Sequence, residues 1–567
     1  MLFRSNLAHM PHGIGKLTLL QSLPLFVVGN DIGLRNHKIG SLSELKGLNQ
    51  LRGGLCISNL QNVRDVELVS RGGILKEKQY LQSLRLEWNR WGQDGGDEGD
   101  KSVMEGLQPH QHLKDIFIDG YGGTEFPSWM MNDGLGSLLP YLIKIEISRC
   151  SRCKILPPFS QLPSLKSLKL KFMEELVELK EGSLTTPLFP SLESLELHVM
   201  PKLKELWRMD LLAEEGPSFS HLSKLYIRAC SGLASLHPSP SLSQLEIRNC
   251  HNLASLELHW SPSLSQLEIR YCHNLASLEL HSSPSLSQLT IIDCHNLASL
   301  ELPSSLRLSD LDIRKCPNLA SFKVALLHSL ETLSLFTVRY GVIWQIMSVS
   351  ASLKSLYIES IDDMISLPKE LLQHVSGLVT LQIRKCHNLA SLELHSSPCL
   401  SKLEIIYCHN LASFNVASLP RLEELSLRGV RAEVLRQFMF VSASSSLESL
   451  SICEIDGMIS LPEEPLQYVS TLETLYIVKC SGLATLLHWM GSLSSLTELI
   501  IYDCSELTSL PEEIYSLKKL QTFYFCDYPH LEKRYNKETG KDRAKIDHIP
   551  RINFQSDRVM EYKVRNP

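Results

Sequence analysis

The chain has 567 residues and a formal net charge of -6 at pH 7. Single hydrophobic cores stop growing at roughly 250–300 residues, so a chain of this length divides into domains or grows in one dimension as a repeat. The acidic balance argues against nucleic acid and anionic lipid, because both attract a concentrated basic surface. We therefore expect a protein partner, with no membrane contact and with nucleic acid disfavoured.

Signals for export or membrane insertion are missing from the sequence. The opening MLFRSNLAHMPHGIG lacks the apolar core of a signal peptide, and no stretch approaches the roughly 18 apolar residues of a membrane span. No Asn-x-Ser/Thr glycosylation sequon occurs. We expect an intracellular protein located in the cytoplasm, with the nucleus as a further location.

The first part of the chain shows an irregular repeat. Residues 1–36 form a partial repeat segment, and residues 37–160 hold long repeats. Within them, residues 64–79 predict a short helix interrupted near Gly72 and Gly73. An acidic insertion near 92–102 lacks the ligand spacing of a calcium loop and predicts an exposed, flexible segment. Its acidic residues are Asp94, Asp97, Glu98 and Asp100.

Residues 161–530 form a regular array. Residues 241–262 are followed at once by residues 263–284, which match them at 20 of 22 positions. The unit reads L-x-x-L-x-[LI]-x-x-C-x-x-L, which is the leucine-rich-repeat pattern. This frame occurs twenty times, with first leucines at positions 51, 81, 113, 142, 165, 192, 222, 242, 264, 286, 308, 330, 353, 378, 400, 422, 447, 472, 496 and 520.

This pattern predicts an α/β solenoid, the leucine-rich-repeat horseshoe. The L-x-[LI] alternation places one short strand in each coil, and neighbouring strands form a long parallel sheet on the concave side. Repeats of 22 residues with Pro262 or Pro284 on the return path leave little room for a helix, so the convex side is predicted to be mostly irregular or short-helical. Residues 531–567 lose the leucine period and predict a C-terminal cap with a basic tail.

The sequence repeats a pair of possible metal ligands but contains no known catalytic motif. Cys-His pairs at 250/251, 272/273, 294/295, 386/387 and 408/409 combine two usual zinc ligands. Their spacing follows the coil period, however, and the cysteines fall in a slot that this architecture turns inward. No phosphate loop, G-x-S-x-G or H-E-x-x-H motif occurs. We expect no enzyme activity, no cofactor and no metal.

The outward positions of the strands offer the candidate protein-contact surface. One column holds Arg228, Arg248, Arg270 and Arg314, and the adjacent column holds Tyr226, Glu246, Glu268 and Asp312. Opposite charges on neighbouring strands often neutralise each other, so a plain solvated ladder is the alternative interpretation. Further outward positions hold side chains that resemble binding anchors, namely Tyr357, Tyr476, Ile500, Tyr502 and Tyr524.

Several segments outside the regular repeats resemble plant intracellular immune receptors. They are HMPHGIGKLTLLQSLPLFVVG (9–29), LRGGLCISNLQNVRDVE (51–67), LKEKQYLQSLRLEW (75–88), VMEGLQPHQHLKDIFIDGYGGTEFPSWM (103–130) and LEKRYNKETGKDRAKIDHIPRINF (531–554). The resemblance is to the leucine-rich-repeat region of coiled-coil, nucleotide-binding disease-resistance proteins. It implies recognition of a pathogen effector or a guarded host protein, and restraint of a nucleotide-binding switch domain in cis or in trans.

The motifs of that switch domain are not in this sequence, and ATP hydrolysis is not carried over with the resemblance. A solenoid needs polar terminal caps, yet the first coil near Leu17 and Leu20 lacks one, so we expect a truncated receptor or one encoded without its switch. The alternative is a repeat-only adaptor that presents a client protein to another complex, such as a ubiquitin ligase.

Overall fold

The computed structural model divides the chain into two compact units, Met1–Leu286 with Asp293–Leu297 and Ser287–Ile292 with Ala298–Pro567. The structure describes residues 7–554 except 31–38, 65, 67–68, 70–72, 90–97, 133, 178, 180–188, 205, 207–218, 237–238, 259–260, 304–305, 368–371, 373, 395–396, 417–418, 443–445, 462–468, 487, 527–528 and 537. Among these residues no helix is both long and apolar enough to cross a membrane.

The first unit is a ladder of parallel strands, each paired with the next coil's strand. The strands are β1 (Leu25–Val27), β2 (Gly53–Ser58), β3 (Leu81–Glu87), β4 (Asp115–Asp119), β5 (Lys144–Ser148), β6 (Ser167–Lys171), β7 (Ser194–His198), β8 (Lys224–Arg228), β9 (Gln244–Arg248) and β11 (Gln266–Arg270).

The second unit repeats this arrangement, again with every pairing parallel. Its ladder contains β13 (Gln288–Ile292), β15 (Asp310–Arg314), β17 (Thr332–Phe336), β18 (Ser355–Glu359), β20 (Thr380–Arg384), β22 (Lys402–Ile406), β24 (Glu424–Arg428), β25 (Ser449–Cys453), β26 (Thr474–Val478), β27 (Glu498–Tyr502), β28 (Thr522–Cys526) and β29 (Arg551–Asn553). Each of the twenty predicted first leucines stands at the start of a strand or two residues before it, which confirms the parallel solenoid.

The core of each coil follows from the alternation in its strand. In β9, Leu245 and Ile247 are buried, whereas the residues between and beside them face outward. The cysteine that follows is also buried, and Cys250 Sγ lies 3.5 Å from the Arg248 carbonyl oxygen. Cys272 repeats this contact with Arg270 at the same distance. The predicted inward column of cysteines is therefore confirmed.

A left-handed residue ends most strands and carries the ladder one step further. The residue before the buried cysteine slot has a positive φ in coil after coil, for example 54° at Val199, 55° at Asn249 and 57° at Gly429. Its amide still donates to the next coil, as Val199 N does to Arg228 O at 2.8 Å. The turn thus keeps the coils in register while it redirects the chain toward the return path.

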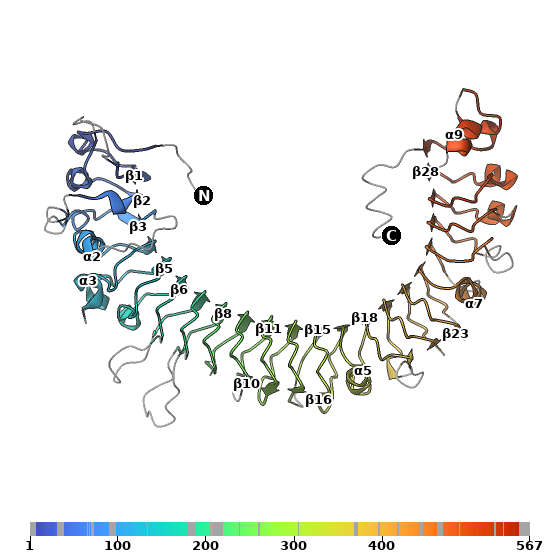
Figure 1. Cartoon of the computed structure of the whole chain (residues 1–567), viewed down its shortest axis with the longest axis horizontal. Coiled ribbons are helices and arrows are strands. Elements are labelled where there is room, and N and C mark those ends of the chain that lie inside the picture. Colours follow the sequence, from blue (N-terminus) through green and yellow to red (C-terminus); the bar gives the residue numbers. More distant parts are fainter. Residues whose placement is uncertain are drawn as a thin grey trace. The chain divides into compact units, whose positions relative to one another are not determined.

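The return path lies on the other side of each coil, as Figure 1 shows. In the first unit β10 (Ser255–Leu258) pairs with β12 (Ser277–Leu280). In the second unit β14 (Ser299–Glu301) pairs with β16 (Ser321–Lys323), and β21 (Ser391–Leu394) pairs with β19 (Ser366–Leu367) and β23 (Ser413–Val416). The 22-residue coils therefore return in extended form, as their length and prolines predict.

Helices are short and occur mainly in the longer coils. The first unit has η1 (Ile14–Lys16), η2 (Leu42–Gly47), η3 (Leu60–Asn62), α2 (Glu98–Glu105), α3 (Ser128–Met131), α4 (Leu135–Leu138) and η4 (Phe159–Gln161). The second has α5 (Tyr340–Met347), α7 (Ala432–Ser442), η5 (His488–Ser492), η6 (Glu512–Ser516), α9 (Pro529–Tyr535) and η7 (Arg543–Lys545). Residues 529–554, which include most of the predicted cap, therefore contain α9, η7 and β29.

The acidic insertion of the long repeats contains a buried carboxylate. The prediction of an exposed, flexible insertion is wrong at Asp100. This residue is buried on α2 and accepts a hydrogen bond from Gly122 N at 3.2 Å. The carboxylate thus fixes α2 to the turn after β4, an interaction between coils that charge counting does not reveal. Asp94 and Asp97 lie outside the described residues, as does much of the helix predicted over 64–79.

A buried lysine joins the coils near the N-terminal end. Lys78 has no exposed surface, and its Nζ donates to Leu45 O at 2.6 Å, to Leu48 O at 3.2 Å and to Asn49 Oδ1 at 3.2 Å. These acceptors lie in the last turn of η2 and just after its end. Burial lowers the pKa of Lys78 to about 8.

Candidate protein-contact surface

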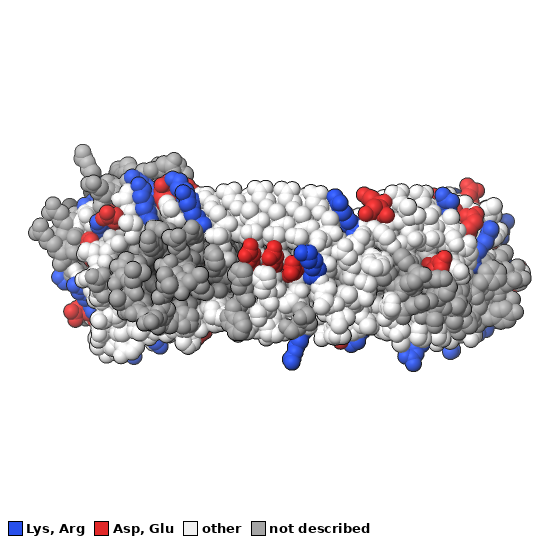
Figure 2. Space-filling view, turned by 90° about the horizontal axis from the view of Figure 1, so that it is seen from below, with Lys and Arg blue, Asp and Glu red and all other residues white. Residues whose placement is uncertain are grey.

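The strand face and the return face differ in what they offer a partner. Figure 2 presents the return face, where charged side chains are sparse among the described residues. The strand face instead carries columns of outward side chains, because parallel pairing in register places equivalent positions beside one another. The predicted contact residues all belong to these columns.

The arginine column of the first unit forms a ladder with the glutamates beside it. Arg228, Arg248 and Arg270 lie in register on β8, β9 and β11. Glu246 accepts from Arg228 at 2.7 Å and from Arg248 at 2.7 Å, and Glu268 contacts Arg248 at 2.5 Å and Arg270 at 2.7 Å. The hydrogen bond that Arg228 donates to Glu246 is the main cause that raises the pKa of Arg228. Each carboxylate therefore bridges two arginines and partly neutralises them, as the solvated-ladder alternative describes.

Arg314 occupies the same column position in the second unit but has different neighbours. It lies between Ile292 and Phe336 in the register and pairs with Asp312 at 2.7 Å. Two further arginines in this column escaped the sequence analysis. Arg384 pairs with Glu404 at 2.6 Å, and Arg428 pairs with Glu454 at 2.8 Å. The repeated L-x-[LI]-x-R spacing is the signal that could have identified both.

The C-terminal aromatic residues do come together. Tyr476, Ile500 and Tyr524 are register partners on β26, β27 and β28, and Tyr502 stands two residues after Ile500. Ile500 is completely buried, and the three half-buried tyrosines pack against it. We call these three tyrosines and Ile500 the tyrosine patch. Ile500 forms its floor, so the rings rather than the isoleucine are exposed to a partner.

One tyrosine of the patch is tied down by a carboxylate. Tyr476 Oη donates to Glu498 Oε2 at 2.9 Å, across the gap between β26 and β27. Burial raises the pKa of Tyr476, and this hydrogen bond raises it further. The ring is therefore held in one orientation on Ile500, which lowers the entropy that it would lose on binding.

Tyr357 is not part of this patch. It lies on β18 in the same column as Tyr476, but β20, β22, β24 and β25 stand between them in the ladder. These strands place polar side chains in the column, namely Gln382, Glu404, Ser426 and Ser451. A contact at Tyr357 would therefore be separate from a contact at the patch.

The cysteine and the histidine of each Cys-His pair face different environments. The cysteines are buried, whereas His251 and His295 are exposed and His273 is partly exposed. The imidazoles stack from coil to coil, with ring centroids 5.1 Å apart for His251 and His273 and 5.2 Å apart for His273 and His295. Burial raises the pKa of the Cys272 thiol to about 11, which further disfavours a metal-binding thiolate.

A ladder of short parallel strands with a buried cysteine column and an outward face of polar and aromatic side chains defines a leucine-rich-repeat protein. Two family models match the chain. One is described as R13L1/DRL21 leucine-rich repeats and matches residues 42–173. The other is described as the leucine-rich repeats of RPS2-like plant disease resistance proteins and matches residues 135–256. From residue 42 to residue 256 the chain thus matches the leucine-rich-repeat region of plant disease-resistance proteins.

Curated relatives agree with this assignment. The putative disease resistance protein RGA1 of Solanum bulbocastanum is 38% identical over 179 residues, which is 32% of this chain and 17% of that protein. RGA4 of the same species is 36% identical over 31% of this chain and 16% of its own length. The putative disease resistance RPP13-like protein 1 of Arabidopsis thaliana is 31% identical over 37% and 21%. The chain thus spans about a fifth or less of these relatives.

A solved structure, the leucine-rich-repeat protein LIC12759 of Leptospira interrogans, aligns with 87% of this chain and 98% of that chain. The sequence identity is 18% and the TM-score is 0.29.

Proposed function

We propose that this leucine-rich-repeat module recognises a protein, either a pathogen effector or a guarded host protein, within the plant cell. In the same proposal it restrains a nucleotide-binding switch domain that is supplied in cis or in trans. The similarity of residues 42–256 to the repeats of disease-resistance proteins supports a role in defence, and the outward strand face supports protein binding. The module acts by binding and contributes no catalytic step.

The observation that carries the binding proposal is the tyrosine patch. Three partly exposed rings rest on one buried aliphatic side chain, Ile500, over three adjacent strands. Tyrosine supplies a large and rigid contact area with a polar tip, and such residues dominate the binding energy of protein interfaces. A cluster on rigid strands can therefore anchor a partner while the rest of the face supplies weaker contacts.

The arginine ladder has a secondary role in this proposal. Arg228, Arg248 and Arg270 share two carboxylates, Glu246 and Glu268, so the ladder keeps a net positive charge of one. A partly neutralised rim changes the association rate and its salt dependence more than it changes affinity. We expect an acidic segment of the partner to approach this ladder and the apolar centre of the interface to form at the patch.

The direct test is the double substitution Tyr476→Ala and Tyr502→Ala in the full chain, expressed in plant cells for proximity labelling and co-immunoprecipitation. The variant should lose most partner capture, because each anchor contributes about 2 kcal/mol or more at such positions. Tyr515→Ala is the matched control, since Tyr515 is an exposed tyrosine on η6 of the same unit. Unchanged capture by the double variant would eliminate the patch as the binding site.

Restraint of the switch is tested separately. The full chain is co-expressed with the coiled-coil and nucleotide-binding domains of a relative such as RGA1, and cell death is scored. Suppressed cell death together with co-immunoprecipitation supports restraint. Labelling that recovers ubiquitin-ligase subunits and no switch domain would favour the adaptor instead.

A further inference from the structure

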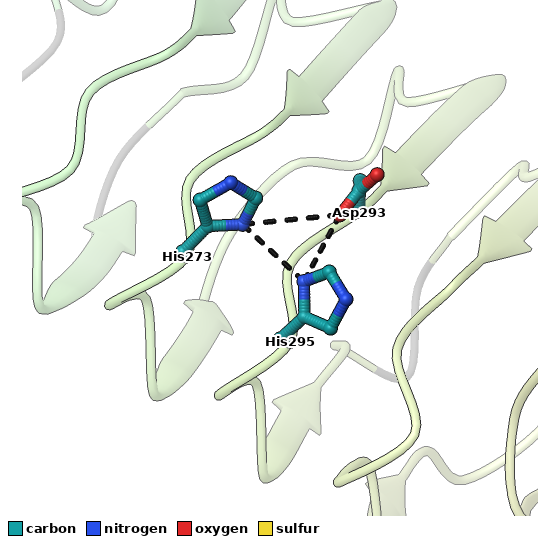
Figure 3. Close-up of side chains that lie close together, drawn as sticks. All are labelled: His273, Asp293 and His295. Carbon is teal, nitrogen blue, oxygen red and sulfur yellow. Dashed lines mark hydrogen bonds and ion pairs between the residues drawn. The ribbon is translucent and has the colours of Figure 1, made fainter.

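We propose that His273, Asp293 and His295 form a binding site for one divalent transition-metal ion, with Zn²⁺ as the natural candidate. The three residues belong to the first unit and come from two successive repeats. Figure 3 shows both imidazoles turned toward the same carboxylate. This inference is independent of protein recognition, and it departs from the expectation that the repeats hold no metal.

The geometry fits a small tetrahedral ion. Asp293 Oδ1 lies 2.9 Å from His295 Nδ1 and 3.8 Å from His273 Nδ1, and the two Nδ1 atoms are 3.3 Å apart. Metal–ligand bonds of 2.0–2.1 Å place the ligands of a tetrahedral zinc site about 3.3–3.4 Å from one another. The three observed separations lie around that value. One ion can therefore bind all three atoms after shifts of a few tenths of an ångström, with the fourth position left to water.

The backbone conformation holds the Asp293 carboxylate in place before an ion binds. Asp293 has a φ of 60°, in the left-handed turn that ends the preceding strand, and its side chain is only 14% exposed. The imidazoles of His273 and His295 are 43% and 52% exposed, so an ion can reach them from solvent. Imidazole nitrogen and carboxylate oxygen are common zinc donors.

The same chain supplies copies that lack the third ligand. His251 and His273 stack with an interplanar angle of 10°, but the position equivalent to Asp293 is Tyr271. His387 and His409 stack at 6°, and the equivalent position is Tyr407. Copying of the repeats explains the imidazole pairs by themselves. It does not explain the carboxylate, which turns one of these pairs into a three-ligand site.

The buried thiols do not compete for the ion. Cys272 and Cys294 follow Tyr271 and Asp293 in the chain, but both are completely buried. Cys272 Sγ points to the Arg270 carbonyl oxygen at 3.5 Å. The ligands are thus the exposed imidazoles and the carboxylate, rather than the Cys-His set that the sequence suggests first.

The test uses the full chain after removal of metal with a chelator. Zn²⁺ affinity is measured by competition with a chromophoric chelator, and Co²⁺ is added as a spectroscopic probe. We expect one ion per chain and a tetrahedral Co²⁺ spectrum without a thiolate charge-transfer band. A thiolate band would assign the ion to cysteine and overturn the proposal.

The matched variant is Asp293→Tyr, which reproduces the residue found in the two sibling pairs. Its Zn²⁺ affinity should fall by more than the roughly 10- to 100-fold that follows loss of an outer-shell partner, because a direct ligand is removed. Tyr407→Asp is the converse variant and should add a second ion at His387 and His409. Binding of equal strength in the wild type and in Asp293→Tyr, with no ion gained by Tyr407→Asp, would overturn the proposal.

Discussion

The left-handed turn after each strand gives a quantitative prediction at Val199. A β-branched residue at φ 54° crowds its own backbone, whereas asparagine tolerates the same region, as Asn249 does at φ 55°. Left-handed geometry costs an ordinary residue about 1–2 kcal/mol. Both backbone amides donate a hydrogen bond to the next coil, Val199 N to Arg228 O at 2.8 Å and Asn249 N to Arg270 O at 3.0 Å. Substitution therefore changes the backbone preference and leaves the ladder intact.

Val199→Asn should therefore stabilise its coil. Val199 is half-buried, so lost apolar contact offsets part of the gain, at about 0.8 kcal/mol for each fully buried methylene. The free energy of local unfolding of this coil should increase by about 0.5–1 kcal/mol in total. The reciprocal change Asn249→Val, at an exposed position, should reduce the free energy of local unfolding of its own coil by about 1–2 kcal/mol.

Native-state amide hydrogen exchange followed by mass spectrometry measures the free energy of local unfolding peptide by peptide. Protection should rise in peptides from β7 and β8 for Val199→Asn and fall in peptides from β9 and β11 for Asn249→Val. Peptides from β26 and β27 serve as internal controls in both proteins. Lower protection in Val199→Asn, or no change in Asn249→Val, would refute the argument from backbone strain.

Two further predictions concern titrating groups in the core. Burial raises the pKa of the Cys272 thiol to about 11, so alkylation of Cys272 at pH 8 should be slow until the chain unfolds. The partly exposed Cys399 should react in the native protein. Equal alkylation rates of the two cysteines in mass-spectrometric peptide mapping would contradict this prediction. Lys78 has a pKa lowered from 10.5 to about 8, so between these values the unfolded state binds more protons and stability rises with pH, by up to roughly 3 kcal/mol. Lys78→Met should remove that rise from urea-unfolding free energies measured between pH 8 and 10, and the exposed-site control Lys76→Met should retain it.

The strand ladder was predictable because each coil repeats a local rule. The L-x-[LI] alternation buries every second residue, and parallel pairing brings equivalent positions side by side. The position of all twenty strands and the buried cysteine column follow from that rule. The rule also identified Tyr476, Tyr502 and Tyr524 as outward residues, and their register made the patch a reasonable expectation.

Contacts between non-equivalent positions were not predictable in this way. The period gave no reason for Asp100 to be buried against Gly122, or for Lys78 to bond to the end of η2. It also treated Ile500 as an outward contact residue, although the three tyrosine rings leave it no exposed surface. These outcomes depend on the sizes of neighbouring side chains and on how far each longer coil extends.

The repeat, the strand in each coil, the inward and outward sets of residues and the resemblance to disease-resistance proteins could all be predicted from the sequence. This was possible because these properties arise from residues a few positions apart or one period apart. The folded structure was needed to show which outward residues share a contact, which charges pair, and that Asp293 lies close to both His273 and His295. Those results depend on the winding of one coil against the next, which brings together side chains at different positions of the repeat.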